Sequence, residues 1–372
     1  MMRQNKLITS ERTDEDHSAF IKILIILFLI FLLYLLRNSW QKDNIVTTMI
    51  LQSFPTYLGF NTTTSDTKKY ISSNLAANSR LGNHLFELSS LLAISRKLKR
   101  TPTFFIASHY HDQMLKDTDF LIPGLIDQFL IVNQTIPESI VPTEFGRKCC
   151  IFDEPERLKQ VTDEYLHLAG HHYQSWKYFA RMRNKLIRYL KTPTNNFTDL
   201  PKSEESTFIS CVHIRRTDFV GTGFHVPEKE FIMNSIKYME IEEKKRQDVN
   251  MTTVFFGDDF QFMEGLVNET LTWRNDTAYK TDSFISQNSP SDDILYAAHH
   301  CDVVLITSPH STFGWWMGFF SKGNEVYYND IKFTDDRSIA SGNFNPDDYF
   351  PPYWTPIKYE DNHNITVIES LK

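Results

Sequence analysis

The second half of the chain alternates short apolar segments with longer amphipathic ones, and this alternation restricts the fold more than any other feature. Strands are predicted at Thr207–Ile214, Thr252–Phe256, Val303–Thr307 and Glu325–Tyr328. Helices are predicted between and after them at Glu228–Lys245, Asp259–Val267, Asp292–His299 and Thr312–Phe320. Strands joined by such helices lie parallel in a sheet that is covered on both faces. The predicted fold class is therefore α/β, and ligands of such sheets bind beyond the carboxyl ends of the strands.

The first half carries fewer periodic segments and ends in a polar stretch. We predict an amphipathic helix over Asn83–Leu98, a buried strand at Thr103–Ala107 and a second helix over Arg181–Leu190. The residues from Asn38 to about Ser73 are rich in Thr, Ser and Asn without clear periodicity, which is typical of a stem or linker. The polar stretch Pro193–Glu205 is the predicted boundary between two lobes.

An apolar segment near the start of the chain, Phe20–Leu36, carries one charge, Lys22. It is just long enough to span a bilayer core of about 30 Å. A signal peptide is the main alternative, but the preceding residues are largely polar and no small-x-small cleavage site follows. A buried core helix would not be apolar all round at a terminus. We therefore predict an uncleaved anchor and these parts: a cytosolic tail (1–19), a transmembrane signal-anchor (20–36), a stem (37–74), an N-terminal, acceptor-side lobe (75–200) and a C-terminal lobe (201–372).

Charges and glycosylation sequons give this anchor a direction. Basic residues are slightly more frequent before the segment than just after it, a mild positive-inside bias. Every Asn-x-Ser/Thr sequon lies on the other side, at Asn61, Asn133, Asn196, Asn250, Asn268, Asn275 and Asn364. These sequons predict N-glycosylation in a secretory compartment. The interpretation is a type II membrane protein with a lumenal or extracellular body.

The cysteines and the net charge limit the chemistry further. Cys149 and Cys150 are adjacent, which disfavours a bond between them. Cys211 falls in a predicted strand, where we expect a buried free thiol, and the remaining cysteine is Cys301. No C-x-x-C occurs that would suggest a zinc or redox site. The formal net charge is −7 without a strongly basic block, which argues against nucleic acid as the main partner.

Two arginines follow the predicted strand Thr207–Ile214. In an extended chain His213 and Arg215 point to one side and Arg216 to the other. We expect Arg215 to face a ligand together with His213, and Arg216 to pair inward with a carboxylate such as Asp218. The planar guanidinium suits phosphate oxygens. A surface salt-bridge cluster is the alternative that these residues leave open.

A Ser/Thr pair, Ser311 and Thr312, stands at the start of the predicted helix Thr312–Phe320. Hydroxyls, free backbone N–H groups and the helix dipole favour an anion there. The alternative is ordinary N-capping before two core tryptophans. The turn Gly257-Asp258-Asp259, after another predicted strand, is interpreted as structural, with Asp259 able to cap the next helix.

Metal binding is not predicted. Asp117-Thr118-Asp119 has a D-x-D spacing that often binds Mn²⁺ or Mg²⁺, but it does not follow an apolar strand. We interpret it as a helix cap or turn. The histidine pairs lack the spacing of metal-ligand sets. A mechanism without metal, with an arginine as the electrophile, fits these residues better.

Four segments resemble, in order, the pattern shared by the α1,2-fucosyltransferases, a family related to the α1,6- and protein O-fucosyltransferases. Ser79–His84 (SRLGNH) is similar to the opening G-R-L-G-N-Q, with Ser and His replacing Gly and Gln. Leu168–Phe179 is similar to L-x-G-Y-x-Q-S-x-K-Y-F. His213–Phe219 matches H-x-R-R-G-D-Y with Thr at the Gly position, and Ser311–Trp316 matches S-T-F-G/S-W-W. The resemblance covers the chain from about residue 75 to 330.

The resemblance implies a Golgi type II enzyme with two Rossmann-like lobes, the GT-B arrangement, that uses GDP-β-L-fucose without a metal or other cofactor. The residues implied as catalytic are Arg215, His213 and Asn83. The residues implied to bind the donor are His213, Arg215, Asp292, Asp293, Ser311, Thr312 and Phe313, with Arg216 and Asp218 as structural support. Arg215 would neutralise the diphosphate, Asn83 would approach the diphosphate or the fucose from the first lobe, and Asp292 or Asp293 would accept from the guanine edge.

The predicted function is transfer of L-fucose with inversion to a glycan acceptor, in an α1,2 linkage to a terminal galactose. The expected partners are GDP-fucose, a galactose-terminated glycan and the membrane, and a homo-oligomer is left open. No general base is identified: Asp218 is assigned to Arg216, and His225 is near only in sequence. The alternatives are another fucose linkage of the α1,6 type and a non-catalytic, lumenal glycan-binding pseudoenzyme.

Overall fold

The computed structural model describes residues 68–194, 196–246, 250–275, 282–361 and 364–370. The predicted cytosolic tail, the predicted transmembrane segment, most of the predicted stem and Asn61 lie outside these ranges. Among the residues so described, no helix combines the length and the apolar character that a membrane span requires.

The first sheet has four parallel strands in the order β3-β2-β1-β4. They are β1 (Tyr70–Ser73), β2 (Thr101–Phe105), β3 (Leu130–Val132) and β4 (Tyr165–Leu168). Its helices are α2 (Leu81–Lys97), α3 (His109–Leu121), α4 (Pro123–Ile126) and α5 (Arg183–Tyr189). β1 corrects the predicted stem, because it lies inside residues 37–74 yet pairs with two strands. A strand of four residues is too short to show a hydrophobic period in the sequence. Its pairing with β2 and β4 fixes its place in the sheet.

The second sheet has seven strands in the order β11-β10-β9-β8-β5-β6-β7. They are β5 (Thr207–Ile214), β6 (Asn250–Gly257), β7 (Ser283–Ile285), β8 (Val303–Ile306), β9 (Glu325–Asn329), β10 (Thr355–Asp361) and β11 (Asn364–Glu369). All neighbours pair in parallel except β10 and β11. The helices are α6 (Lys229–Arg246), α7 (Phe260–Asn275), α8 (Pro290–His300), α9 (Thr312–Phe320), α10 (Arg337–Ala340) and α11 (Pro346–Tyr349). The α/β class with parallel sheets is confirmed.

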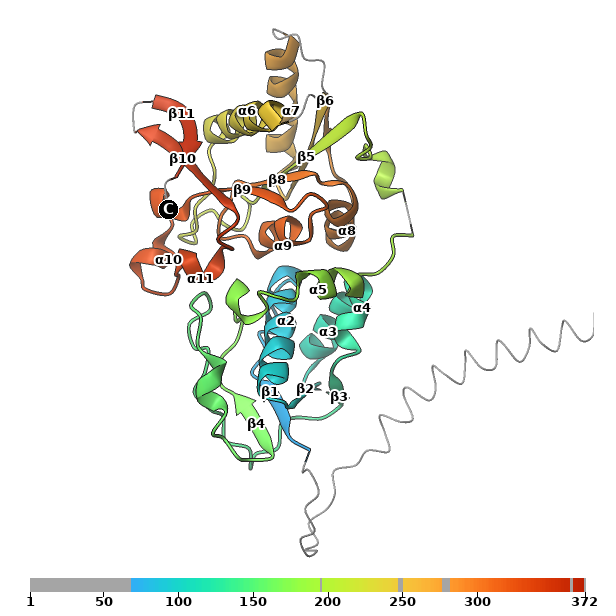
Figure 1. Ribbon diagram of the computed structural model, residues 1–372, viewed down its shortest axis with the longest axis vertical. Helices are drawn as coiled ribbons and strands as arrows, with labels where there is room; N and C mark the ends of the chain where they lie inside the picture. The colour runs from blue at the N-terminus through green and yellow to red at the C-terminus, as the bar shows by residue number, and fades with distance from the viewer. Residues whose placement is uncertain (1–67, 195, 247–249, 276–281, 362–363, 371–372) are drawn as a thin grey trace, which may run out of the picture. The chain divides into compact units, whose positions relative to one another are not determined.

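Alternate residues of β5 face two different apolar cores. Val212 and Ile214 belong to the core that contains Ile232 and Ile236 of α6. Ile209 and Cys211 belong to the other core, which contains residues of α8 and α9 and continues to α2 in the first part of the chain. Figure 1 shows α6 and α7 on one side of the seven-stranded sheet and α8 and α9 on the other. This double burial explains why β5 carries apolar residues on both of its faces.

Helix α9 joins this second core to the helix that follows β1. The ring of Trp315 lies 4.5 Å from that of Phe86 in α2, and the ring of Trp316 lies 5.1 Å from it. Trp316 Nε1 also donates to Gly82 O at 2.9 Å. Both tryptophans are fully buried. They are therefore core residues, and they place the start of α9 against the start of α2.

The cysteine predictions are wrong. Cys211 is disulfide-bonded to Cys301, and Cys149 is bonded to its neighbour Cys150. Cys211 points to the face of β5 that α8 covers, and Cys301 directly follows α8, so that their Cα atoms lie 5.6 Å apart. That separation lies in the range a disulfide needs. Sequence spacing does not show which face of a strand meets which helix end.

Candidate functional site

The carboxyl ends of β5, β6 and β8 lie side by side and place three polar segments at one edge of the larger sheet. Ile214 pairs with Gly257 and His213 pairs with Ile306. The segments that follow these strands therefore begin together, at residues 215, 258 and 307. This edge is where parallel α/β sheets bind their ligands.

Arg215 is fixed at this edge by two carboxylates. Its Nε and one terminal amine donate to the two carboxylate oxygens of Asp218, each at 2.7 Å, and Nε lies 3.2 Å from Asp258. Only 17% of the Arg215 side chain is exposed. Ser308, in the loop after β8, binds both the N–H and the carbonyl of Arg215, at 2.9 and 3.0 Å. The guanidinium is therefore held in one orientation.

The predicted pairing of Arg216 with Asp218 is wrong. Arg216 Nε binds Asp259 at 3.2 Å, and its guanidinium lies 3.8 Å from the ring of Phe262 in α7. The chain turns directly after Arg216, because Val220 N donates to Arg216 O at 3.1 Å. That turn folds Asp218 back onto Arg215, whereas alternation along an extended strand would have put it with Arg216.

Asp258 organises the segment that carries the two arginines. Its carboxylate accepts from Arg216 N at 2.9 Å and from the hydroxyl of Thr217 at 2.5 Å, besides its contact with Arg215. Asp259 accepts from Phe262 N at 3.1 Å and so caps the first turn of α7, as predicted. The structural interpretation of this turn is confirmed for Asp259. For Asp258 it is incomplete, because this carboxylate also contacts Arg215 at the candidate site.

His213 lies behind the start of α9 and is buried. Its Nε2 lies 3.4 Å from the Ser311 hydroxyl, and the ring packs so closely on Gly314 that a Cβ there would be 2.5 Å from Nδ1. Burial lowers the pKa of His213 to about 4, so the ring is neutral at neutral pH. Ser311 accepts from Gly314 N at 3.5 Å and is the N-cap of α9, which was the alternative interpretation of this segment.

The start of α2 lies against the start of α9. A Cβ on Gly82 would lie 2.6 Å from the Thr312 hydroxyl and 2.8 Å from Phe313 N, so only glycine allows this approach. Neither helix has an acidic residue in its first turn. Arg80, just before α2, lies 3.3 Å from Asp218, and Asn83 Oδ1 accepts from Gln174 at 2.9 Å. Two helix N-termini and two arginines therefore meet at one place.

Asp292 and Asp293 lie in the first turn of α8, apart from these contacts. Asp292 accepts from the Ser289 hydroxyl at 2.9 Å, and its N–H bonds the same hydroxyl at 3.2 Å. Asp293 accepts from Ser286, and burial raises the pKa of its carboxyl to about 7. Within the described ranges, neither carboxylate forms a hydrogen bond or ion pair with Arg215, Ser311 or Asn83.

The D-x-D segment is not a cap or turn, which corrects that prediction. Asp117 and Asp119 lie inside α3, and Gln113 donates to Asp117 at 2.7 Å. Among the described residues, no group of three or more His, Cys, Asp or Glu side chains is placed to hold a metal ion.

Sequence reasoning did not assign roles to Arg80, Gln174 or Asp258, although two of them stand in the motifs quoted above. Arg80 and Gln174 lie within two of these motifs. Their partners in the structure, Asp218 and Asn83, are 138 and 91 residues away along the chain. Only folding brings such pairs together. Of the sequons, Asn133, Asn196 and Asn268 have exposed side chains.

An edge of a parallel sheet at which helix N-termini and arginines converge is a feature of α/β enzymes that bind anionic groups. The sequence model described as glycosyl transferase family 11 matches residues 42–358. The chain is 44% identical to a putative galactoside 2-alpha-L-fucosyltransferase of Caenorhabditis elegans, over 85% of each chain. It is 36% identical to a putative glycosyltransferase of that organism, over 93% of this chain and 96% of the relative.

A third relative, a galactoside 2-alpha-L-fucosyltransferase of the same organism, is 30% identical over 77% of this chain and 76% of its own. The protein is thus a glycosyltransferase. It belongs to glycosyl transferase family 11, the α1,2-fucosyltransferase family, and is a fucosyltransferase enzyme.

Proposed function

We propose that this enzyme transfers L-fucose from GDP-β-L-fucose to the 2-hydroxyl of a terminal galactose, with inversion at the anomeric carbon. The names of two relatives support the acceptor and the linkage. The donor is proposed because fucose transfer needs an activated fucose, and the site described above suits a diphosphate. The fold would act as two Rossmann-like lobes in the GT-B manner, one for each sheet.

One observation carries this proposal: the first turns of α2 and α9 meet beside Arg215. Unpaired N–H groups at a helix start carry partial positive charge and bind phosphate oxygens. A glycine at position 82 keeps this place compact, and neither helix carries an acidic residue in its first turn that would compete for its N–H groups. As the C1–O bond breaks, negative charge collects on the departing diphosphate. Fixed donors there stabilise the transition state more than the ground state.

The side chains of this edge would divide the work. Two N–H groups of Arg215 bind Asp218, which leaves three of its five donors for the diphosphate. Thr312 and Phe313 would bind phosphate through the first turn of α9, and Asn83 would reach it from α2, oriented by Gln174. Ser311 and neutral His213 would keep that turn in place. Asp292, with its partly exposed carboxylate, would accept from guanine, with Asp293 behind it.

We further propose that the enzyme is a type II Golgi membrane protein and needs no metal ion. Residues 20–36 and the sequons support the topology, and the exposed Asn133, Asn196 and Asn268 are open to glycosylation. Arg215, Arg80 and the two helix starts supply the positive potential that a metal would otherwise provide.

The experiment is a donor and acceptor test on the full-length protein purified in detergent. GDP-fucose, GDP-mannose and UDP-galactose would each be offered with galactose-terminated glycans, with N-glycans or without acceptor, in EDTA or in Mn²⁺. We expect GDP release from GDP-fucose only, dependent on the galactose acceptor and unchanged by EDTA. Linkage analysis of the product should give fucose on O2. Fucose on another hydroxyl, or loss of activity in EDTA, would contradict the corresponding part of the proposal.

A further inference from the structure

His310 lies in the turn between β8 and α9, and this turn is hydrogen-bonded to Arg215. Ser308, at the beginning of this turn, binds the backbone of Arg215, and Ser311, at its end, caps α9. Ser311 N donates to Ser308 O at 3.0 Å, which closes the turn around Pro309 and His310. His310 is therefore held beside the proposed diphosphate site by the same residues that build it.

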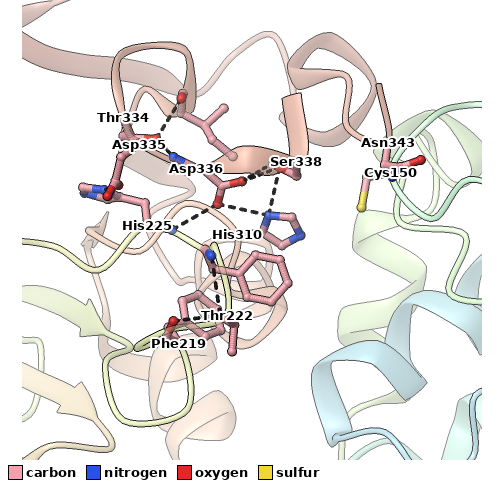
Figure 2. A network of polar contacts seen from close by, with 12 residues as sticks. Cys150, Phe219, Thr222, His225, His310, Thr334, Asp335, Asp336, Ser338 and Asn343 are labelled. Carbon is pink, nitrogen blue, oxygen red and sulfur yellow. Dashed lines mark hydrogen bonds and ion pairs between the residues drawn. The ribbon is translucent and has the colours of Figure 1, made fainter. Parts of the chain in front are cut away.

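One ring nitrogen of His310 faces a buried carboxylate. Nδ1 lies 3.3 Å from Asp336 Oδ2 and 3.3 Å from the hydroxyl of Ser338 (Figure 2). The Asp336 side chain has no exposed surface, and it also accepts from Ser338 N at 2.9 Å and from His225 N at 3.2 Å. Burial alone would raise the pKa of Asp336, but the bonds from His310 and Ser338 lower it to about 2. Asp336 is thus a fixed anion behind the imidazole.

The other contacts of the His310 ring are with aromatic side chains. The His310 ring is clamped between Phe224, whose centroid is 4.2 Å away, and Phe344, at 5.0 Å. Its side chain keeps 10% exposure, and within the described ranges Nε2 has no hydrogen-bond partner. A carboxylate on Nδ1 favours the tautomer with the proton there, so that Nε2 carries a free lone pair. A histidine oriented in this way by an aspartate is equipped to accept a proton.

The other candidate bases at this edge are occupied. Asp218 binds Arg215 and Arg80, and Asp258 binds both arginines and Thr217. His225 is paired through Nδ1 with Asp335. Around the His310 ring, the titratable groups are Asp336 and Tyr349, whose ring is 6.4 Å away, with His225 and Asp335 reached through Asp336.

We propose that His310 is the general base of fucosyl transfer and that Asp336 is its positioning residue. This inference rests on the proposed function. As the acceptor oxygen forms its bond to C1 of fucose, the hydroxyl proton passes to Nε2 of His310. The electron pair of the breaking C1–O bond stays with the diphosphate, and GDP departs. The imidazolium then gives the proton to water, which restores the enzyme.

The test compares His310→Gln with Asp336→Asn in the full-length protein. General bases contribute about 10²–10⁴-fold, so we expect His310→Gln to lower kcat by that factor while the Kd for GDP-fucose changes less than about twofold. The wild-type kcat should fall at acid pH, and this acid limb should disappear in His310→Gln. Asp336→Asn should also lower kcat, but by less than His310→Gln and with the Kd for GDP-fucose within about twofold, because the base remains and only its orientation is lost. The matched control is His109→Gln, an exposed histidine at the start of α3, which should match the wild type.

A second variant keeps the proposal testable if glutamine disturbs the turn. In His310→Ala, added imidazole should restore part of the transfer rate without changing the Kd for GDP-fucose. Near-wild-type kcat in His310→Gln, an acid limb that disappears in His225→Gln instead, or an absence of imidazole rescue in a folded His310→Ala would each overturn the role of His310. A wild-type protein that binds no GDP-fucose would refute the proposed function itself, so the two failures are distinguishable.

Discussion

At the scale of single residues, the site depends on how each charged group is oriented. Arg215 is held in one orientation by Asp218, Asp258 and the Ser308 hydroxyl. The guanidinium of its neighbour Arg216 packs on the ring of Phe262 instead. Two adjacent arginines thus have unrelated tasks. The sequence motif alone does not distinguish them, because the turn after Arg216 determines which of the two arginines forms an ion pair with Asp218.

Arg215→Lys should lower kcat by about 10²–10³ with the fold intact, because lysine keeps the charge but loses the planar fork. The loss should be larger in kcat than in the Kd for GDP-fucose, which steady-state kinetics and donor titration can separate. The matched control is Arg188→Lys, an exposed position in α5. Near-native turnover of Arg215→Lys would refute its proposed role.

His213 should make folding less favourable as the pH falls from about 6.5 to about 4. In this window the unfolded chain takes up a proton on His213, while burial holds the folded pKa at about 4. The penalty is absent above pH 6.5 and grows by about 1.4 kcal/mol for each pH unit below it. Asp293 and Glu87, whose pKa values burial raises to about 7, change stability in the opposite direction.

The contribution of His213 is therefore measured as a difference. Denaturant unfolding of His213→Gln and of the wild type at pH 7 and pH 4.5 should show the variant gaining about 2 to 3 kcal/mol relative to the wild type at the lower pH. A difference that stays constant between the two pH values would show that His213 is not held neutral by the fold.

At the scale of elements, the contact of the α2 and α9 starts decides where the site forms. Gly82→Ala would place a methyl group 2.6 Å from the Thr312 hydroxyl and 2.8 Å from Phe313 N, and the latter is backbone that cannot move aside cheaply. We expect a loss of about 1–3 kcal/mol in the free energy of unfolding and weaker binding of GDP-fucose. Calorimetry with and without GDP-fucose measures both.

Gly265→Ala, within α7, is the matched control. A Cβ at Gly265 meets nothing within 4 Å, so alanine should be neutral or stabilise by up to about 1 kcal/mol through its helix propensity. If both variants lost the same stability, close packing at Gly82 would not be the cause.

At the scale of the whole molecule, the described residues belong to one compact unit, and a disulfide within it links the end of α8 to the centre of β5. Removing that bond in Cys211→Ala/Cys301→Ala should cost about 2–5 kcal/mol, because the bond closes a loop with a sequence separation of 90. The control is Cys149→Ala/Cys150→Ala, whose bond has a separation of 1 and constrains almost no chain. Equal losses in denaturant unfolding would contradict this account.

The sequence by itself determined the parallel α/β architecture of the second half, because buried parallel strands must be apolar on both faces. β5 and α9 have the predicted bounds, and the other predicted strands and helices there differ only at their ends. It also determined the family, through motif letters at Arg215, Asn83 and Ser311. The strands β1, β3, β4, β7, β10 and β11 were missed. Four of them have only three or four residues, too few to show a period, whereas β10 and β11 are longer and carry no unbroken apolar run.

Only the tertiary structure determined which side chains form pairs. The partners Arg215 and Asp218, Cys211 and Cys301, Arg80 and Asp218, and His310 and Asp336 depend on turns and on element faces that no local pattern records. The physical reason is that periodicity reports whether a side chain is buried, whereas chemistry at this site depends on which distant group lies opposite it.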